Sequence, residues 1–162
     1  MLFRSDLALS QIGAAVRKGS PKPDISSVDA LRQALLNAQS VAYSASASGT
    51  YISGELFERL GITDRMKDKA KRIYSERVGA VVARGDAELG FQQVSELIPF
   101  KELDFIGTLP SEVQQTIYFS SALVNGSAQD RLAVARQLVG FFTSPAVADV
   151  VRATGLEPAT RR

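Results

Sequence analysis

Short apolar runs alternate with helical patterns over the first part of the chain, and this alternation restricts the fold more than any other feature. The runs at 12–17, 40–44 and 87–92 have the length and apolar content of buried strands. The helical patterns between them cover 27–38, the positions Ile52, Leu56 and Leu60, and the positions Val78, Val81 and Val82. Strands that alternate with helices in this way predict an α/β fold with a mostly parallel sheet.

The last third of the chain continues with two strands and two helices. Strand patterns occur at 103–110 and 116–124, and Asn125-Gly126 then predicts a turn. A shorter helix over 146–153 closes the sequence pattern. Before it, one apolar stripe predicts a long amphipathic helix, formed by Leu132, Ala135, Leu138, Val139 and Phe142.

The composition removes several common kinds of functional site. The chain has no His and no Cys among its 162 residues, so it cannot form a His-based triad, a thiol nucleophile, a His or Cys zinc site, or a disulfide. Most common enzyme chemistries are therefore excluded. We expect no catalytic residues, no metal, no cofactor and no enzymatic activity, and an enzyme that depends on Ser46 or Ser48 is the weaker alternative. The 19 Lys and Arg against 17 Asp and Glu give a formal charge of +2, which is too small to indicate a nucleic-acid partner.

The sequence also limits the location of the protein. No window reaches the roughly 20 apolar residues of a membrane span. The N-terminal residues are not followed by an apolar stretch long enough for the core of a signal peptide. If the chain is a full gene product, we expect it in the cytoplasm.

The loop at 44–50 is the strongest candidate for a binding site. A predicted strand runs through small residues into a helix start, where unpaired backbone N–H groups and the positive end of the helix dipole attract an anion. The hydroxyls of Ser46 and Ser48 can add donors. The alternative is that Ser48 only caps the helix and that the small residues serve packing. The local sequence leaves both interpretations open.

Two neighbouring features are interpreted as structural. Ser75 is a candidate cap for the helix that follows it, with Glu76 near the positive end of that helix. This helix start gains functional interest only if the fold directs it at the same cleft as the loop at 44–50. The cations between Arg65 and Arg72 are interpreted as a solvated helical face.

Several blocks of residues, spread over most of the chain, match one known family. These blocks are Val16-Arg17-Lys18-Gly19-Ser20-Pro21-Lys22-Pro23-Asp24-Ile25, Ala42-Tyr43-Ser44 with Ser48-Gly49, Leu60-Gly61-Ile62, Ala83-Arg84-Gly85-Asp86-Ala87-Glu88-Leu89-Gly90, Gly107-Thr108-Leu109-Pro110 and Phe141-Phe142-Thr143-Ser144-Pro145-Ala146. In this order, from about residue 12 to 158, the chain resembles the molybdate-binding-protein-like branch of the ABC-transporter substrate-binding proteins.

The resemblance implies a two-lobed fold of the type II periplasmic binding proteins. In that fold, hydroxyls and backbone amides at helix starts hold an oxyanion or a small organic acid between the lobes. The resemblance implies that 9–98 form the complete second, inserted lobe and that 99–162 return to the first lobe, whose N-terminal part is lacking. Where molybdate binders have a tyrosine, this chain has Gln93. The ligand-binding residues that we expect are Ser46, Ser48, Gly49, Thr50, Ser75, Gln92 and Gln93.

The resemblance also implies a role and partners. We expect the solute-binding component of a periplasmic ABC import system, with an ABC permease as partner and a hinge near Pro99. Because half of the site is lacking, we expect weak ligand binding by this chain, and a homodimer that covers its exposed apolar surface. The alternative is an effector-binding or protein-interaction domain of a regulator with the same fold.

Overall fold

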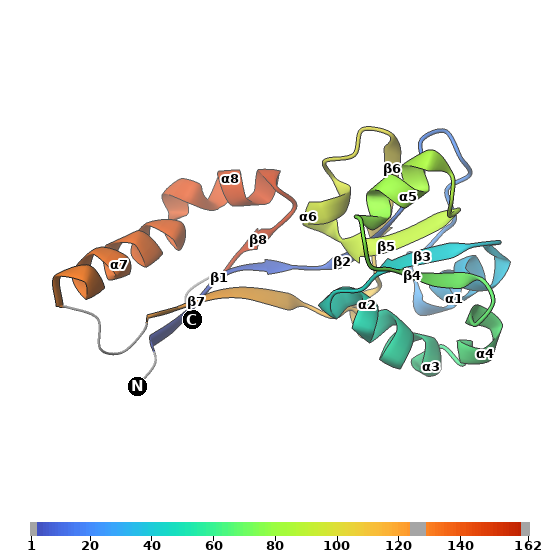
Figure 1. The fold of residues 1–162 in the computed structure, drawn as a ribbon, viewed down its shortest axis with the longest axis horizontal. Helices are drawn as coiled ribbons and strands as arrows, with labels where there is room; N and C mark the ends of the chain where they lie inside the picture. Colours follow the sequence, from blue (N-terminus) through green and yellow to red (C-terminus); the bar gives the residue numbers. More distant parts are fainter. Residues whose placement is uncertain (1–2, 124–128, 160–162) are drawn as a thin grey trace. The chain divides into compact units, whose positions relative to one another are not determined.

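The computed structural model describes residues 3–123 and 129–159, and the chain divides into two units (Figure 1). The larger unit is Gln11–Gln115, and the smaller unit combines Met1–Ser10 with Thr116–Arg162. The boundary expected between residues 98 and 99 therefore falls inside the larger unit, because the strand at 103–108 joins the sheet of that unit. Pro99 lies inside the larger unit as well, and the chain passes between the units at 10–11 and 115–116.

A five-stranded sheet with the order β4-β3-β5-β2-β6 forms the centre of the larger unit. Its strands are β2 (Ile12–Arg17), β3 (Val41–Ser44), β4 (Ala70–Ile73), β5 (Leu89–Gln93) and β6 (Leu103–Thr108). β3 runs parallel to β4 and β5, whereas β2 runs antiparallel to β5 and β6. The expected α/β class is confirmed. The sheet is mostly parallel as predicted, since β3, β4, β5 and β6 run in one direction, but β2 runs against them. The alternation of strands and helices along the sequence does not determine the direction of β2, which is the first strand of this sheet along the chain.

Helices cover both faces of this sheet (Figure 1). They are α1 (Val28–Asn37), α2 (Ala47–Tyr51), the π-helical turn η1 (Ile52–Leu56), α3 (Phe57–Arg59), α4 (Thr63–Met66), α5 (Val78–Arg84), α6 (Val94–Leu97) and the 3₁₀ turn η2 (Ser111–Val113). The helices α1 to α3 pack through Leu31, Leu35 and Ile52 against Phe91 of β5. On the other face, α5 packs against Ala42 of β3. The unit is thus an α/β/α sandwich.

The structure confirms the residues that were predicted to start the first helix and to end the second. Ser27 caps α1 by accepting a hydrogen bond from the Ala30 N–H at 3.1 Å. The predicted second helix is a continuous helical run from α2 to α3 with a π turn in its middle, and it ends before Gly61, whose φ is +64°. A π turn lengthens one helical step and is often found at functional sites.

The cationic stretch that ends at Arg72 differs from its expected structure. It divides into the short helix α4 and the strand β4, so the interpretation as one solvated helical face is wrong. The parallel pairing of β4 with β3 places Arg72 beside Tyr43. β4 is four residues long and has two adjacent cations between two apolar residues, so its sequence carries little periodic signal.

The smaller unit contains a three-stranded sheet with the order β7-β1-β8. Its elements are β1 (Phe3–Ser10), β7 (Ile117–Leu123), α7 (Gln129–Phe142), the 3₁₀ turn η3 (Pro145–Val147), α8 (Ala148–Ala153) and β8 (Glu157–Pro158). β1 was not predicted, because charged residues interrupt its apolar pattern. The turn expected at 125–126 lies outside the described residues.

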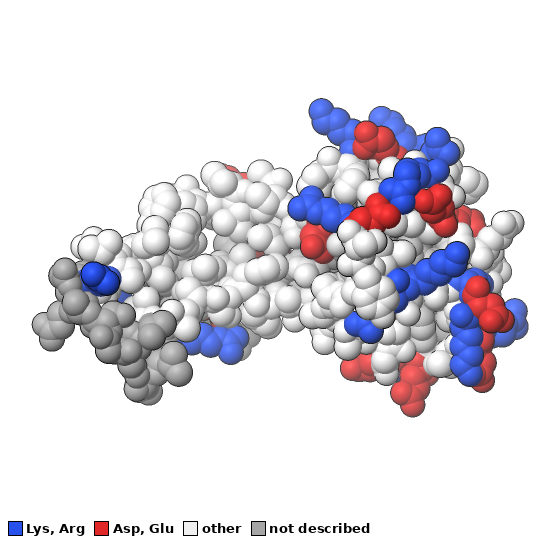
Figure 2. Space-filling view, viewed as in Figure 1, with Lys and Arg blue, Asp and Glu red and all other residues white. Residues whose placement is uncertain are grey.

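The surface of the smaller unit is unusually apolar. Val139 of α7 is buried, but Val134, Leu138 and Phe141 form a stripe on the same helix that is 53–65% exposed. Leu138 and Phe142 therefore do not share the buried face that the sequence predicted for them. Figure 2 shows, on the face in view, that Lys, Arg, Asp and Glu gather on the larger unit. None of the helices within 3–123 and 129–159 is long and apolar enough to cross a membrane.

Candidate functional site

The carboxyl ends of the parallel strands β3, β4 and β5 meet at one edge of the sheet in the larger unit. In open α/β sheets, ligands bind at this edge, because loops and helix starts follow the strands there. The loop after β3 leads into α2, the loop after β4 leads into α5, and β5 leads directly into α6. The expected site residues all lie in these segments.

A triangle of serine hydroxyls, which we call the serine cluster, lies where β3 ends and α2 begins. The Ser44 Oγ lies 2.7 Å from the Ser46 Oγ and 3.0 Å from the Ser48 Oγ, and the Ser46 and Ser48 Oγ atoms are 3.2 Å apart. Ser44 and Ser48 are buried, whereas Ser46 is exposed. Each hydroxyl can rotate its proton, so the cluster can turn O–H groups from one another toward a bound anion.

The helix start at α2 does not follow the capping alternative. Ser46, not Ser48, is the N-cap residue, and no side chain caps this helix. The Ser46 hydroxyl bonds to the other serines instead of to the helix N–H groups. The first N–H groups of the run from α2 to α3 therefore remain available to a ligand, as the anion interpretation expects.

Gly49 allows the helix to start this close to the strand. A Cβ added to Gly49 would lie 1.5 Å from the Ser44 carbonyl oxygen, which is a backbone atom that cannot move aside. Only glycine fits at this position without displacing α2 from the end of β3. Gly49 is thus a requirement for the geometry of the serine cluster.

Thr50 connects the serine cluster to a cation. Its Oγ1 donates to the Ser46 carbonyl at 3.2 Å and accepts from the Arg72 Nη2 at 2.9 Å. The same Nη2 donates to the Ala45 carbonyl at 3.1 Å. The sequence analysis missed both Arg72 and Ser44. If residues 70–73 had been predicted as a strand, Arg72 would have been expected at this edge of the sheet.

The other expected residues occupy different positions. Gln92 accepts from the Val78 N–H at 2.9 Å through Oε1, and so holds the start of α5 in the role that was expected of Ser75. Ser75 is exposed and lies before the N-cap residue Arg77, so its expected capping role is wrong. Gln93 is 9% exposed, and its Oε1 has no hydrogen-bond partner in the described part of the chain.

The electrostatics of this edge favour an anion. Arg84 donates to both carboxylate oxygens of Glu76, at 2.7 and 2.8 Å, and this hydrogen bonding lowers the pKa of Glu76. Among the described residues, no carboxylate pairs with Arg72 or Arg77. Within the same residues, no group of His, Cys, Asp and Glu could hold a metal ion.

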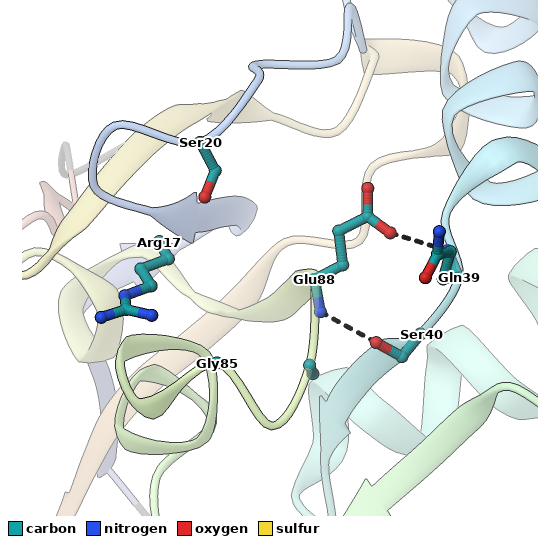
Figure 3. Close-up of a pocket in the computed structure, with 7 residues that line it drawn as sticks. Arg17, Ser20, Gln39, Ser40, Gly85 and Glu88 are labelled. Carbon is teal, nitrogen blue, oxygen red and sulfur yellow. Dashed lines mark hydrogen bonds between the residues drawn. The ribbon is translucent and has the colours of Figure 1, made fainter.

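A concavity with a volume of about 360 Å³ lies at the opposite edge of the sheet (Figure 3). Its main feature is Glu88, which accepts from the Gln39 N–H at 2.7 Å while its own N–H donates to the Ser40 Oγ at 3.0 Å. These bonds join the starts of β3 and β5. We interpret this place as a structural connection, because its carboxylate is already engaged by the backbone.

Comparison with known proteins identifies the family. A family model described as bacterial extracellular solute-binding protein matches residues 3–157. The chain belongs to this family. Its fold is that of the type II periplasmic binding proteins, as the resemblance implied. A molybdenum ABC transporter substrate-binding domain from Clostridium difficile superimposes with a TM-score of 0.73 at 18% identity, covering 96% of this chain and 66% of that chain.

Two further comparisons bear on the fold and on the function. The periplasmic molybdate-binding protein of Azotobacter vinelandii superimposes with a TM-score of 0.63 at 19% identity, over 97% of this chain and 68% of that chain. A curated relative from Pseudomonas sp., named aconitate isomerase, is 46% identical over 155 residues, which are 96% of this chain. The chain spans 58% of the length of that relative.

The relative from Pseudomonas corrects one expectation. The sequence analysis expected no enzymatic activity, because His and Cys are absent, but a protein 46% identical to this chain is named as an enzyme. The expectation rested on a list of chemistries that need His, Cys or a metal. Isomerisation by proton transfer can use Lys, Tyr, Asp or Glu as the acid and base, so the absence of His and Cys does not exclude it.

Proposed function

We propose that this chain forms the serine-cluster half of a site for a small polycarboxylate, and that the protein isomerises aconitate. The serine cluster carries the proposal, because hydroxyls and uncapped N–H groups converge at one strand end beside Arg72, which pairs with no carboxylate of the described residues. The identity with the aconitate isomerase of Pseudomonas supports the substrate. Aconitate is a propene tricarboxylate, so it offers the oxyanions that such a site attracts.

The proposed role of each group follows from its hydrogen-bonding capacity. Ser46 and Ser48 donate O–H groups to one carboxylate, together with the first N–H groups of α2, and Thr50 joins them when its O–H turns away from the Ser46 carbonyl. Donors held in place before the ligand arrives stabilise negative charge as it shifts during isomerisation. Gln93 adds an amide whose Oε1 is free for a bridging water. Ser75 and Gln92 complete the proposed set at the start of α5, with Gln92 acting through Val78.

The experiment is an NMR time course of cis-aconitate with the purified protein, since the vinyl protons of the cis and trans isomers resonate separately. Conversion above the protein-free rate that falls in Ser48→Ala, with Ser53→Ala as the matched control, supports the proposal. The Ser53 hydroxyl donates to the Gly49 carbonyl, away from the cluster. A protein that neither converts nor binds aconitate at millimolar concentration contradicts it.

A second role is favoured by the family itself. We propose that the bound anion is also a candidate cargo for an ABC permease in the periplasm, because the chain belongs to the extracellular solute-binding proteins. Binding of aconitate without conversion would favour this role over isomerisation. The assignment of the larger unit to the inserted lobe, and the covering of the apolar stripe on α7 by a second copy, remain parts of this proposal.

A further inference from the structure

Arg72 is the cation nearest to the serine cluster by hydrogen bonding, yet half of its guanidinium is unused. Its Nη2 donates to the Thr50 Oγ1 at 2.9 Å and to the Ala45 carbonyl at 3.1 Å. Its Nε is buried and has no hydrogen-bond partner in the described structure. Nor do these residues provide an acceptor for its Nη1. A buried N–H without an acceptor costs free energy. The Nη1, in contrast, is not buried, so it is the donor that a partner from outside the chain can reach.

Tyr74 holds the guanidinium at this place. The Arg72 Cζ lies 5.6 Å from the centroid of the Tyr74 ring, which is a cation–π distance. Tyr74 is itself 78% exposed, although it is a large apolar side chain. The Nη2 is thus fixed by Thr50 and Ala45, the face of the guanidinium is in contact with Tyr74, and the Nη1 is left as the accessible donor.

The opposite side of the loop offers a second unused polar group. The Gln92 side chain points to the α5 face of the sheet, where it bonds to Val78. Successive side chains of a strand point to opposite faces, so Gln93 lies on the other face, with Phe91 and α2. Gln93 is nine-tenths buried and its Oε1 is unpartnered. Two unpaired groups of opposite hydrogen-bonding character therefore lie on the side of the sheet that carries the serine cluster.

We infer that Arg72 binds a carboxylate of the ligand through its Nη1, and that Tyr74 positions it. This inference rests on the proposed function and adds a cation to the proposed polycarboxylate site. A tricarboxylate carries several negative charges, and a hydrogen bond from a charged guanidinium stabilises a carboxylate more than a bond from a hydroxyl or an amide does.

The first test follows the Arg72 Nε–H resonance while trans-aconitate is added to the labelled protein. We expect this resonance to move with the same concentration dependence as the amides of 45–50. If those amides move and the Arg72 resonance does not, the inference is overturned while the proposed function stands. If nothing moves, the proposed function itself fails.

Variants separate binding by Arg72 from a structural role. Arg72→Met should weaken aconitate binding at least about tenfold, because a hydrogen-bonded charge is lost. Arg72→Lys, which keeps the charge but loses the guanidinium bonds to Thr50 and Ala45, should weaken it by about threefold, and so should Tyr74→Leu, which loses the cation–π contact. Lys71→Met is the matched control, because Lys71 is an exposed neighbour on the same strand. Equal affinities in the folded Arg72→Lys, Tyr74→Leu and Lys71→Met variants would overturn the inference.

Discussion

Both hydrogen-bonding groups of the Gln114 side-chain amide pair with the backbone of Ile12. The Ile12 N–H donates to the Gln114 Oε1 at 2.9 Å, and the Gln114 Nε2 donates to the Ile12 carbonyl at 3.0 Å. The amide thus imitates one step of strand pairing. It joins the two places where the chain enters and leaves the larger unit, next to 10–11 and 115–116.

The same exit segment is also anchored to the helix that starts at the serine cluster. The Tyr51 hydroxyl donates to the Val113 carbonyl at 2.7 Å, and the Arg59 Nη2 donates to the Glu112 carbonyl at 2.7 Å. Burial raises the pKa of Tyr51 and so keeps its hydroxyl protonated as a donor. The site helix and the exit segment of the larger unit are therefore one rigid assembly.

Gln114→Ala should lower the free energy of unfolding by about 1–2 kcal/mol, because the N–H of the fully buried Ile12 loses its acceptor. Chemical denaturation measures this loss. Gln115→Ala is the matched control at the next position, where the Oε1 already lacks a partner. It should change stability by less than about 0.5 kcal/mol. Equal effects of the two substitutions would show that the pairing with Ile12 contributes nothing.

Gly49→Ala should destabilise the protein by about 2 kcal/mol or more, because its Cβ would clash with the Ser44 carbonyl oxygen. Gly54→Ala, five residues later in the same helical run, meets no atom within 4 Å. It should stabilise the helix by about 0.5–1 kcal/mol. Thermal unfolding of both variants gives the comparison. A Gly49→Ala variant as stable as the parent would mean that the close approach of α2 to β3 is not required.

Acid should destabilise the larger unit through Asp104. The Gly19 N–H donates to the Asp104 Oδ2 at 3.1 Å, and this bond, followed by Lys22 at 3.3 Å, lowers the pKa of Asp104 below its ordinary value of 3.8. A lowered folded pKa gives stability that is present above pH 3.8 and lost as the pH falls through the folded value. The melting temperature of Asp104→Asn should therefore depend less steeply on pH in this window than that of the parent.

The control for this pH dependence is Asp68→Asn. Asp68 forms no hydrogen bond or ion pair within the described residues. Its variant should keep the acid dependence of the parent. If Asp104→Asn and Asp68→Asn give the same pH profile, the bond to Gly19 is not what stabilises the loop after β2.

The apolar stripe on α7 should cause self-association of this chain. Val134, Leu138 and Phe141 are each more than half exposed, and exposed apolar patches are typical of interfaces. Light scattering after size exclusion should show a species larger than one chain. A Leu138→Lys and Phe141→Lys double variant should shift it toward the monomer. A monomeric parent at all concentrations would contradict this prediction.

The sequence predicted the elements of the larger unit well because their signals are local. Ser27 caps α1 and Gly61 ends the helical run as their residue types indicate. The direction of β2, the strand β4 and the strand β1 were missed, because pairing partners decide them and these partners are distant in sequence. The loop at 44–50 was found through its small residues. Arg72 was missed because its role depends on the register between β4 and β3.

A backbone amide NMR titration with trans-aconitate tests the central claim most directly. We expect shift changes at Ser46, Ser48, Gly49 and Thr50 with a dissociation constant on the order of 1 mM, which follows from the proposal that this chain forms one half of the site. No such changes should occur at Arg17 and Glu88 in the concavity at the opposite edge. A titration that leaves 45–50 unchanged, or that moves only Arg17 and Glu88, would contradict the account.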